Sequence, residues 1–403
     1  MVRLAPNEVS FIDAEACRDV YAYRSGHRPF PKNPVWVPEP PKDSGKAPSI
    51  LNADDEDHAR IRKAWAYGFS DKAFKDHEPL ITSHVDMLIT RLRQLIDTKT
   101  GDAILDIVKW YNFCVFDIIG DLAFGESFGC LDGQIYHSWI KTIIHHFKAA
   151  VLMSACRYYA WLYRLLVWSI PKTSIQKQYQ HFLMTKQKVQ SRLAIEQDKP
   201  DFLSHLTKAR EALTDSEIES TAGIIIIAGS KSLTTTLAGT TNYLLRFPQA
   251  LEKLSKEVRT AFRTEADINL TTLGQLPYLS SVIEEGLRII TPVPLGMPRL
   301  VPKGGDTVCG EWLPEDVSSC HTVLRILSTD LLFARLVSHS CNGERVSPRT
   351  VLLTQLSSDQ SAGWIQVKLS CRHSRRIDGM LCSHSRLACV PALVRSLLTL
   401  SCD

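Results

Sequence analysis

The residues whose types could do chemistry lie at the midpoint of the stretch Thr221–Gly239, TAGIIIIAGSKSLTTTLAG. Gly229 puts no side chain on its face of a helix, which is useful where another group must lie against the backbone. Ser232 follows one turn later, and its hydroxyl can both donate and accept a hydrogen bond, whereas the ammonium of Lys231 can only donate. The segment leaves one alternative open, a buried helix whose glycine is tolerated and whose hydroxyls bond their own backbone carbonyls.

Basic side chains at two other places could bind carboxylates. His58 and Arg62 are four residues apart in DEDHARIRKAW and therefore share one face of a helix. Two donor groups on one face suit a pair of carboxylates, although an exposed polar face supporting Asp54 and Glu56 is the alternative. Arg299 follows a proline-rich turn. Its guanidinium could recognise a carboxylate through two parallel hydrogen bonds, or it could lie at a rim with no partner.

Glu285 and Arg288 are three residues apart and can pair along a helix. If the pair is buried, each member needs further partners. The alternative is a surface ion pair, which would contribute at most about 1 kcal/mol to stability.

A long central helix must position the glycine and the hydroxyl. Thr214 followed three residues later by Glu217 predicts a capping box at its start, and Pro248 predicts that it stops by Arg246. Such a helix would be roughly 45 Å long at about 1.5 Å per residue. Periodicity predicts further helices over residues 13–24, 52–69, 77–98, 104–124, 138–159, 174–198, 201–212, 248–262 and 278–290. Short strands are predicted within residues 2–11 and from Val293 onward.

Composition excludes some classes of protein. A formal charge of +4 over 403 residues is too small to indicate nucleic-acid binding. The eleven cysteines have no regular spacing, which favours a reducing compartment over a disulfide framework. Residues 1–21 contain no apolar segment typical of a signal peptide or a membrane anchor. The stretch Ala149–Ile170 interleaves aromatic and basic residues, so it is either an interfacial amphipathic segment or a plain core helix.

Three motifs in this order, Ala228-Gly229, Glu285-x-x-Arg288 and Pro298-Arg299, resemble the cytochrome P450 family. The sequence FDIIGDLAFGESFGCL at 116–131 is similar to the corresponding segment of fungal members that work in secondary metabolism. The resemblance implies a mainly α fold, a P450-like helical fold with a small β-sheet region.

The resemblance also implies roles for single residues around a haem cofactor. His58, Arg62 and Arg299 would bind the haem propionates, and Glu285 with Arg288 would anchor the segment leading to the haem-binding loop. Gly229 and Ser232 would be the catalytic positions of the oxygen-binding helix.

The implied function is a monooxygenase that hydroxylates or epoxidises a lipophilic intermediate, such as a terpenoid or a polyketide. The implied partners are an NADPH–cytochrome P450 reductase, O2, the lipophilic substrate and a membrane surface, without nucleic acid. The implied location is the surface of the endoplasmic reticulum membrane, or the cytoplasm, since no anchor is recognised here.

The sequence departs from the family pattern at the central helix. Lys231 stands where the family has an acid, and Ser232 stands where it has a threonine. An acid and a hydroxyl would relay protons, so the lysine puts that relay in question.

A second departure follows Val317. The family's glycine-rich loop, Phe-x-x-Gly-x-Arg-x-Cys-x-Gly, supplies the thiolate ligand of the iron, and none of the late cysteines has these neighbours. The metal ligand is therefore unknown. Those late cysteines are Cys320, Cys341, Cys371, Cys382, Cys389 and Cys402.

The composition also changes at this point. Ser, Leu, Arg and Cys supply 45 of the last 86 residues, which contain ten Lys or Arg against five Asp or Glu. We therefore expect residues 1–317 to form an incomplete P450-like domain. Residues 318–403 are expected to be an atypical tail, irregular or disordered, arising from a shifted reading frame or an unspliced intron. The alternatives are an inactive remnant that lacks the thiolate, and a helical protein that binds lipid or membrane surfaces.

Overall fold

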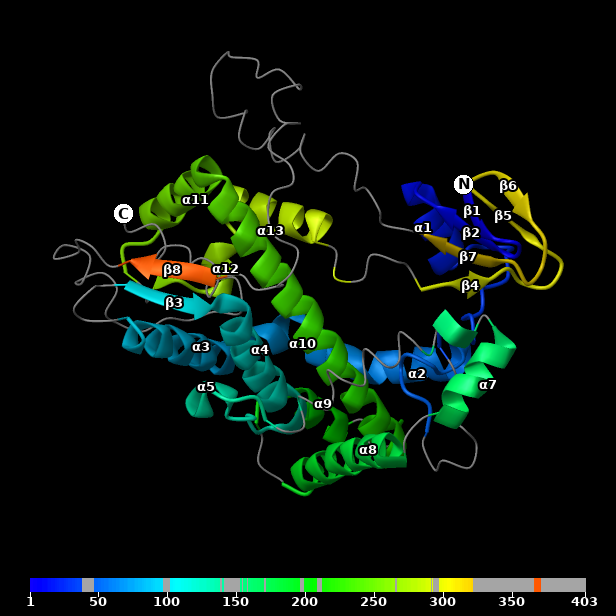
Figure 1. The fold of residues 1–403 in the computed structure, drawn as a ribbon, viewed down its shortest axis with the longest axis horizontal. Coiled ribbons are helices and arrows are strands. Elements are labelled where there is room, and N and C mark those ends of the chain that lie inside the picture. Colours follow the sequence, from blue (N-terminus) through cyan, green and yellow to red (C-terminus); the bar gives the residue numbers. More distant parts are fainter. Residues whose placement is uncertain are drawn as a thin grey trace, which may run out of the picture.

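The computed structural model shows a mainly helical chain with a small sheet at one end (Figure 1), which confirms the predicted fold class. It describes residues 1–403 except 38–46, 97–101, 138–139, 141–152, 154, 158, 170–171, 196–198, 209–211, 265–266, 291, 293–296, 322–365 and 371–403. Most of the predicted tail and most of the predicted helix over 138–159 thus lie outside the described residues.

The central helix α10 (Asp215–Arg246) runs through the middle of the helical part (Figure 1). The predicted capping box is confirmed, because Thr214 Oγ1 accepts from the Glu217 backbone N–H while the Glu217 carboxylate accepts from the Thr214 N–H. The helix stops at Arg246, and Pro248 begins the next helix, α11 (Pro248–Ala261). Helix α10 packs most extensively against α4 (Ile107–Phe124).

Helix α4 begins later than the periodicity predicted. Residues Asp102–Asp106 form strand β3, and Asp106 then caps α4 by accepting from the Lys109 backbone N–H. The predicted helical start at 104 is therefore wrong. The apolar run around Ile104 fits a strand as well as a helix, and the capping aspartate marks the true boundary.

The other helices surround this pair and share one apolar core with it, which contains the fully buried Tyr111, Phe113 and Phe116. They are α2 (Asp55–Trp65), α3 (Asp71–Gln94), α5 (Cys130–Gly133), α8 (Lys172–Leu193), α9 (Phe202–Lys208), α12 (Leu270–Leu273) and α13 (Pro277–Ile289). The described residues of the 3₁₀ helix η2 (Ala66–Phe69) and of α7 (Ala160–Ser169) do not belong to this core.

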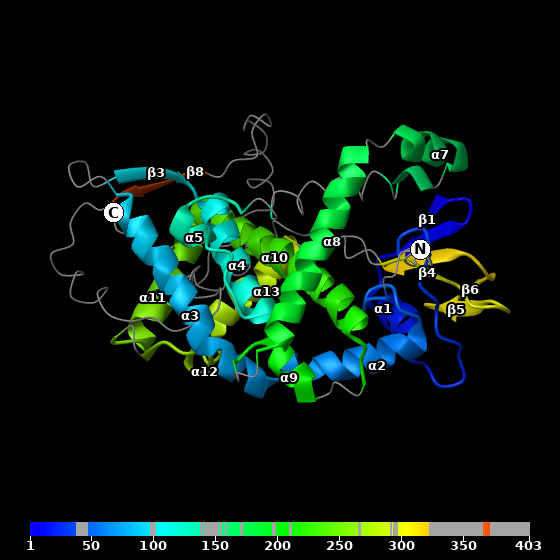
Figure 2. The same cartoon turned by 90° about the horizontal axis from the view of Figure 1, so that it is seen from below.

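The sheet lies at the opposite end of the molecule from α3 and α11, and α2 reaches toward it (Figure 2). Its strand order is β1-β2-β7-β4, from β1 (Val2–Ala5), β2 (Glu8–Phe11), β7 (Ser318–His321) and β4 (Arg299–Leu300). Strands β2 and β7 are parallel, and β4 is antiparallel to β7. Helix α1 (Ala14–Tyr21) covers it with a second, smaller apolar core.

Two further strand pairs complete the described structure. Strands β5 (Asp306–Val308) and β6 (Glu311–Leu313) form a hairpin beside the sheet. Strand β3 pairs antiparallel with β8 (Gln366–Ser370), which belongs to the predicted tail. Strand β7 also lies beyond the predicted domain boundary at 317, yet it is an inner strand of the sheet.

Among the described residues, one helix is long and apolar enough to cross a membrane by length and composition. That helix is α10, and its packing against α4, α8, α13 and α11 gives it the position of a core helix.

Candidate functional site

Four basic side chains from three segments gather where α2 approaches the sheet: Lys32, His58, Arg62 and Arg299, called the cation cluster below. His58 and Arg62 lie on one face of α2, and Arg299 opens β4. Lys32 forms an antiparallel β-bridge with Arg299. Burial, then the positive charges of Lys32, Arg62 and Arg299, lower the pKa of His58. The structure therefore brings the three predicted carboxylate-binding residues together and adds a fourth.

No carboxylate of the described residues contacts the cation cluster directly. Within the described part of the chain, none of its four members forms an ion pair, and Arg299 Nε is buried without a hydrogen-bond partner. One terminal N–H of Arg299 donates to the Phe30 carbonyl at 3.1 Å. Burial and then the charge of Arg299 lower the pKa of Lys32, against a smaller opposing effect of two acids at the start of α2. Lys32, His58 and Arg299 are half-buried and Arg62 is exposed. A buried N–H normally has a hydrogen-bond partner, so the Arg299 Nε and the positive charges around it suit an anionic ligand with more than one carboxylate.

At the midpoint of α10, unlike in the cation cluster, the glycine and the hydroxyl groups contact other parts of the protein. A Cβ added to Gly229 would lie 2.8 Å from Ile119 Cδ1, so the group that lies against this backbone is a side chain of α4. The Ser232 hydroxyl donates to the Ala228 carbonyl, and the Thr236 hydroxyl donates to the Ser232 carbonyl at 3.1 Å. The hydroxyls thus bond their own helix, which is the geometry of the structural alternative given above.

Lys231 points toward α4. Its ammonium donates to Asn112 Oδ1 at 2.9 Å, and the Asn112 amide nitrogen donates to the Val108 carbonyl at 2.8 Å. Burial lowers the pKa of Lys231. The lysine at the family's acid position is therefore held by a neutral amide on a neighbouring helix.

Glu285 and Arg288 form a two-point ion pair on α13. Arg288 Nε and a terminal nitrogen donate to the two carboxylate oxygens of Glu285, each at 2.6 Å. Glu285 is 4% exposed, so the alternative of a surface pair is wrong. The hydrogen bonds to Glu285 raise the pKa of Arg288. Gly286 lets α13 approach α10, since a Cβ there would lie 2.3 Å from Thr240 Oγ1.

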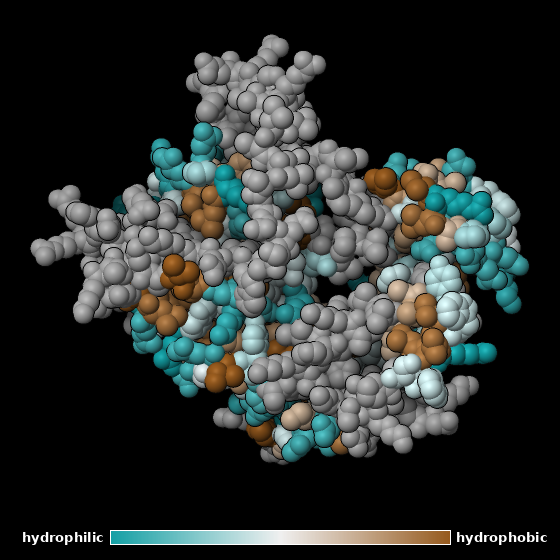
Figure 3. Space-filling model, in the orientation of Figure 1, coloured by the Kyte–Doolittle hydropathy of each residue, from teal (hydrophilic) through white to brown (hydrophobic). Residues whose placement is uncertain are grey.

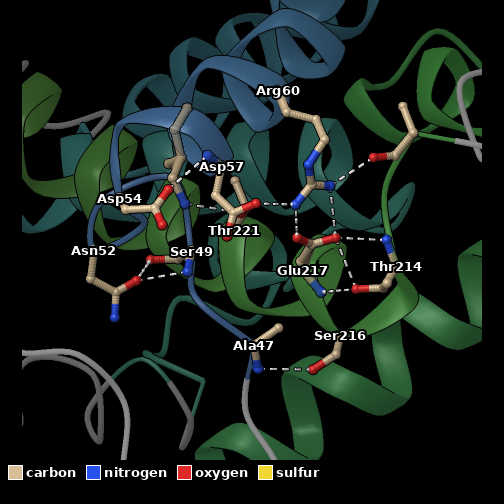
Figure 4. Close-up of polar contacts among 12 residues, drawn as sticks. Ala47, Ser49, Asn52, Asp54, Asp57, Arg60, Thr214, Ser216, Glu217 and Thr221 are labelled. Atoms are coloured by element: carbon tan, nitrogen blue, oxygen red, sulfur yellow. Dashed lines mark hydrogen bonds and ion pairs between the residues drawn. The ribbon is translucent and has the colours of Figure 1, made fainter.

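A polar contact between Arg60 and Glu217 fixes α2, the helix that carries His58 and Arg62, to the central helix α10 (Figure 4). Arg60 donates to both carboxylate oxygens of Glu217, to Asp57 Oδ1 at 2.6 Å and to the Ala212 carbonyl at 2.7 Å. Glu217 is also the capping-box residue of α10. One carboxylate therefore caps the central helix and holds α2 against its start.

Sequence reasoning missed Lys32 and Arg60. Lys32 lies in a proline-rich connection, where periodicity gives no signal. Arg60 is two residues from His58 and so faces away from it, and its partner is 157 residues further along the chain.

The late cysteines contribute one described residue to the structure. Cys320 lies in β7, where it is buried and its thiol donates weakly to the Val9 carbonyl. The other five fall outside the described residues.

Comparison with known proteins gives the family. The sequence model described as Cytochrome P450 matches residues 11–316. The chain is 39% identical over 326 residues to "Cytochrome P450 monooxygenase astA" of Talaromyces wortmannii, covering 80% of this chain and 64% of that protein. It is 39% identical over 324 residues to "Cytochrome P450 monooxygenase efuB" of Hormonema carpetanum, covering 79% and 63%.

A more distant relative has the same extent of match. "Cytochrome P450 monooxygenase atr2" of Stereocaulon alpinum is 35% identical over 316 residues, covering 78% of this chain and 62% of that protein. The chain spans less than two thirds of the length of each of these three relatives. The matched part contains the central helix, the Glu285–Arg288 pair and all four members of the cation cluster. The chain therefore belongs to the cytochrome P450 family, and the relatives that it matches are fungal P450 monooxygenases.

Proposed function

We propose that this chain is a fungal secondary-metabolism P450 that binds haem through the cation cluster. The observation that carries the proposal is the convergence of Lys32, His58, Arg62 and Arg299. Among the described residues, no carboxylate contacts them, and the buried Arg299 Nε has no hydrogen-bond partner. Haem presents two carboxylates at one edge of a flat apolar ring, and this donor set suits such an edge. The residues present therefore fit the carboxylate end of the cofactor.

Several residues would hold or orient the cofactor. His58, Arg62 and Arg299 would donate to its carboxylates. The Glu285–Arg288 pair would fix α13 against the central helix, as the contact of Gly286 with Thr240 supports. Haem, when bound with a thiolate ligand, supplies the oxygen chemistry of the family. The metal ligand is not assigned to any residue of this chain.

Proton movement at the central helix would depend on Ser232 and Lys231. The Ser232 hydroxyl would have to leave the Ala228 carbonyl before it could donate to a bound molecule. Lys231, held by Asn112 and with a lowered pKa, could give up a proton more readily than an exposed lysine. The proposed role of Gly229 is the close approach of α4, with Ser232 as the proton-donating position.

The reaction, substrate and partners belong to the same proposal. The substrate would be a lipophilic terpenoid or polyketide intermediate, hydroxylated or epoxidised with O2, and the electrons would come from an NADPH–cytochrome P450 reductase. The protein would work at the surface of the endoplasmic reticulum membrane. The relatives named above, which are all called monooxygenases, support this reading.

Haem titration and a CO-difference spectrum test the proposal and its alternative, the inactive remnant. The apo-protein should bind haem with quenching of its tryptophan fluorescence, and an active enzyme should then give the red-shifted Soret band of a thiolate-bound CO complex. Binding without that band supports a remnant that keeps the carboxylate site. A chain that is folded by circular dichroism but binds no haem contradicts the proposal.

A second candidate function is binding to membrane surfaces, which one observation favours. Helix α7 exposes large apolar side chains, with Trp161 69% and Trp168 84% exposed, beside the exposed Leu165 and Val167. Figure 3 shows apolar side chains gathered at this place. Tryptophan suits the boundary between lipid and water. Co-sedimentation with liposomes should fall when Trp161 and Trp168 are both changed to Ser. No sedimentation of the unchanged chain contradicts this candidate.

A further inference from the structure

Lys32 is fixed by its backbone to the strand that carries Arg299. The two residues form a β-bridge, flanked by hydrogen bonds from the Leu300 N–H to the Pro31 carbonyl at 2.8 Å and from the Asn33 N–H to the Pro298 carbonyl at 3.1 Å. The position of Lys32 therefore follows β4, although 267 residues separate it from Arg299 in the chain.

The side chain of Lys32 reaches the start of α2. Its ammonium donates to the Ala53 carbonyl at 2.7 Å. Ala53 is 1% exposed and directly precedes Asp54, the N-cap of α2, whose carbonyl accepts from the His58 N–H. Lys32 thus ties the strand that carries Arg299 to the helix that carries His58 and Arg62.

The Lys32 ammonium has further N–H groups that could donate to a ligand. An ammonium carries three N–H groups, and the hydrogen bond to Ala53 uses one of them. Lys32 is half-buried, and the charge of Arg299 acts on it more strongly than the charge of Asp55 or of Asp54. A cation in this position gains most from an anion that also contacts Arg299.

We propose that Lys32 is a fourth carboxylate-binding residue of the cation cluster and also sets the spacing between Arg299 and the basic face of α2. The ligand class is a porphyrin with free carboxylates. This inference rests on the haem-binding proposal, and it adds a residue that motif comparison does not single out.

The test titrates haem and haem dimethyl ester into apo-protein, with tryptophan fluorescence quenching as the readout. The ester keeps the ring and the iron but has no carboxylate charge. Lys32→Met should weaken haem binding about tenfold or more, as expected for one charge-assisted hydrogen bond, and should leave ester binding nearly unchanged. Lys32→Arg should keep most of the affinity for haem. Lys63→Met, an exposed change on α2, should alter neither affinity.

Lys32→Gln is the second variant, because its amide can still donate to the Ala53 carbonyl without a charge. It should lower the ratio of haem affinity to ester affinity even if Lys32→Met does not fold.

The remaining outcomes are distinguishable. Equal weakening of haem and ester binding would show that Lys32 only supports the fold, and unchanged haem binding in Lys32→Met and Lys32→Gln would overturn the inference while the proposed function stands. A folded wild-type chain that binds neither ligand would overturn both.

Discussion

The midpoint of α10 and the cation cluster both carry polar residues, but the first satisfies them within the protein, whereas the second does so only in part. Ser232 and Thr236 bond carbonyls of their own helix, and Lys231 bonds Asn112. In the cation cluster, basic groups from three segments lie near one another, and the buried Nε of Arg299 has no hydrogen-bond partner among the described residues. The comparison teaches that a motif of chemically capable residues does not by itself locate a ligand. Unpaired charge, in contrast, indicates where a ligand is needed.

The largest expected effect comes from creating unpaired charge in the helical core. Glu285→Ala should lower the free energy of unfolding by about 3 kcal/mol, because it leaves the Arg288 guanidinium without its carboxylate. Urea unfolding followed by circular dichroism measures the change. The control is Glu284→Ala, an exposed neighbour that should change stability by less than about 0.5 kcal/mol. Equal effects of the two changes would mean that the buried pair does not stabilise α13.

In the cation cluster, removing a charge should have the opposite effect on the apo-protein. Arg62→Gln should leave its stability unchanged or raise it, since one positive charge is removed from a cluster that also contains Lys32 and Arg299. Haem affinity should fall about 10- to 100-fold, because a charge-assisted hydrogen bond to a carboxylate is lost. Thermal unfolding and haem titration measure the two quantities, with Lys63→Gln as the matched control on α2. An Arg62→Gln variant that loses stability but keeps haem affinity would show that Arg62 supports the fold and does not bind the ligand.

The charge of Lys231 should appear in the pH dependence of stability. Burial lowers its pKa in the folded chain from the ordinary value of 10.5, so the unfolded chain binds more protons just below that pH. The stability of the wild type relative to Lys231→Met should therefore rise as the pH rises through the lowered pKa toward 10.5. Urea unfolding of both proteins from pH 7 to pH 10 measures the difference, in which the other titrating groups largely cancel. A difference that does not change with pH contradicts a desolvated Lys231.

The smallest effect should come from Gly229→Ala. The added methyl group would lie 2.8 Å from Ile119 Cδ1, the movable end of a side chain, and it gains about 1 kcal/mol of helix propensity. We expect the free energy of unfolding to change by less than about 1 kcal/mol. The double variant with Ile119→Val should be more stable than the two single changes predict, as a thermodynamic cycle would measure. Strict additivity would mean that α4 does not pack on this glycine.

Features with a local cause could be predicted from the sequence. The central helix is predicted to within a residue at each end, because the capping box and the proline each lie in the chain directly beside the helix end that they mark. His58 and Arg62 could be placed on one face by their spacing alone. That this face meets Arg299 was implied by the family resemblance, and the geometry agrees.

Features that depend on distant partners could not be predicted. The contact between Arg60 and Glu217 joins residues that no periodicity relates. Lys32 acquires its place from the β-bridge to Arg299. The hydrogen bond from Lys231 to Asn112 depends on how two helices cross, which their separate sequences do not specify.

The parallel pairing of Glu8–Phe11 with Ser318–His321 has a consequence for how the chain is made. During synthesis on a ribosome, the β1–β2 hairpin emerges before the helices, but one edge of it stays open until residue 321 has followed. The helices from α2 to α13 can collapse before that moment, since all their partners are already present. An open strand edge invites mispairing with other chains, and contacts this distant form slowly. The strands β1 and β2 thus precede the helices in the chain but reach their native neighbours after them, and a nascent chain needs protection at this open edge during that interval.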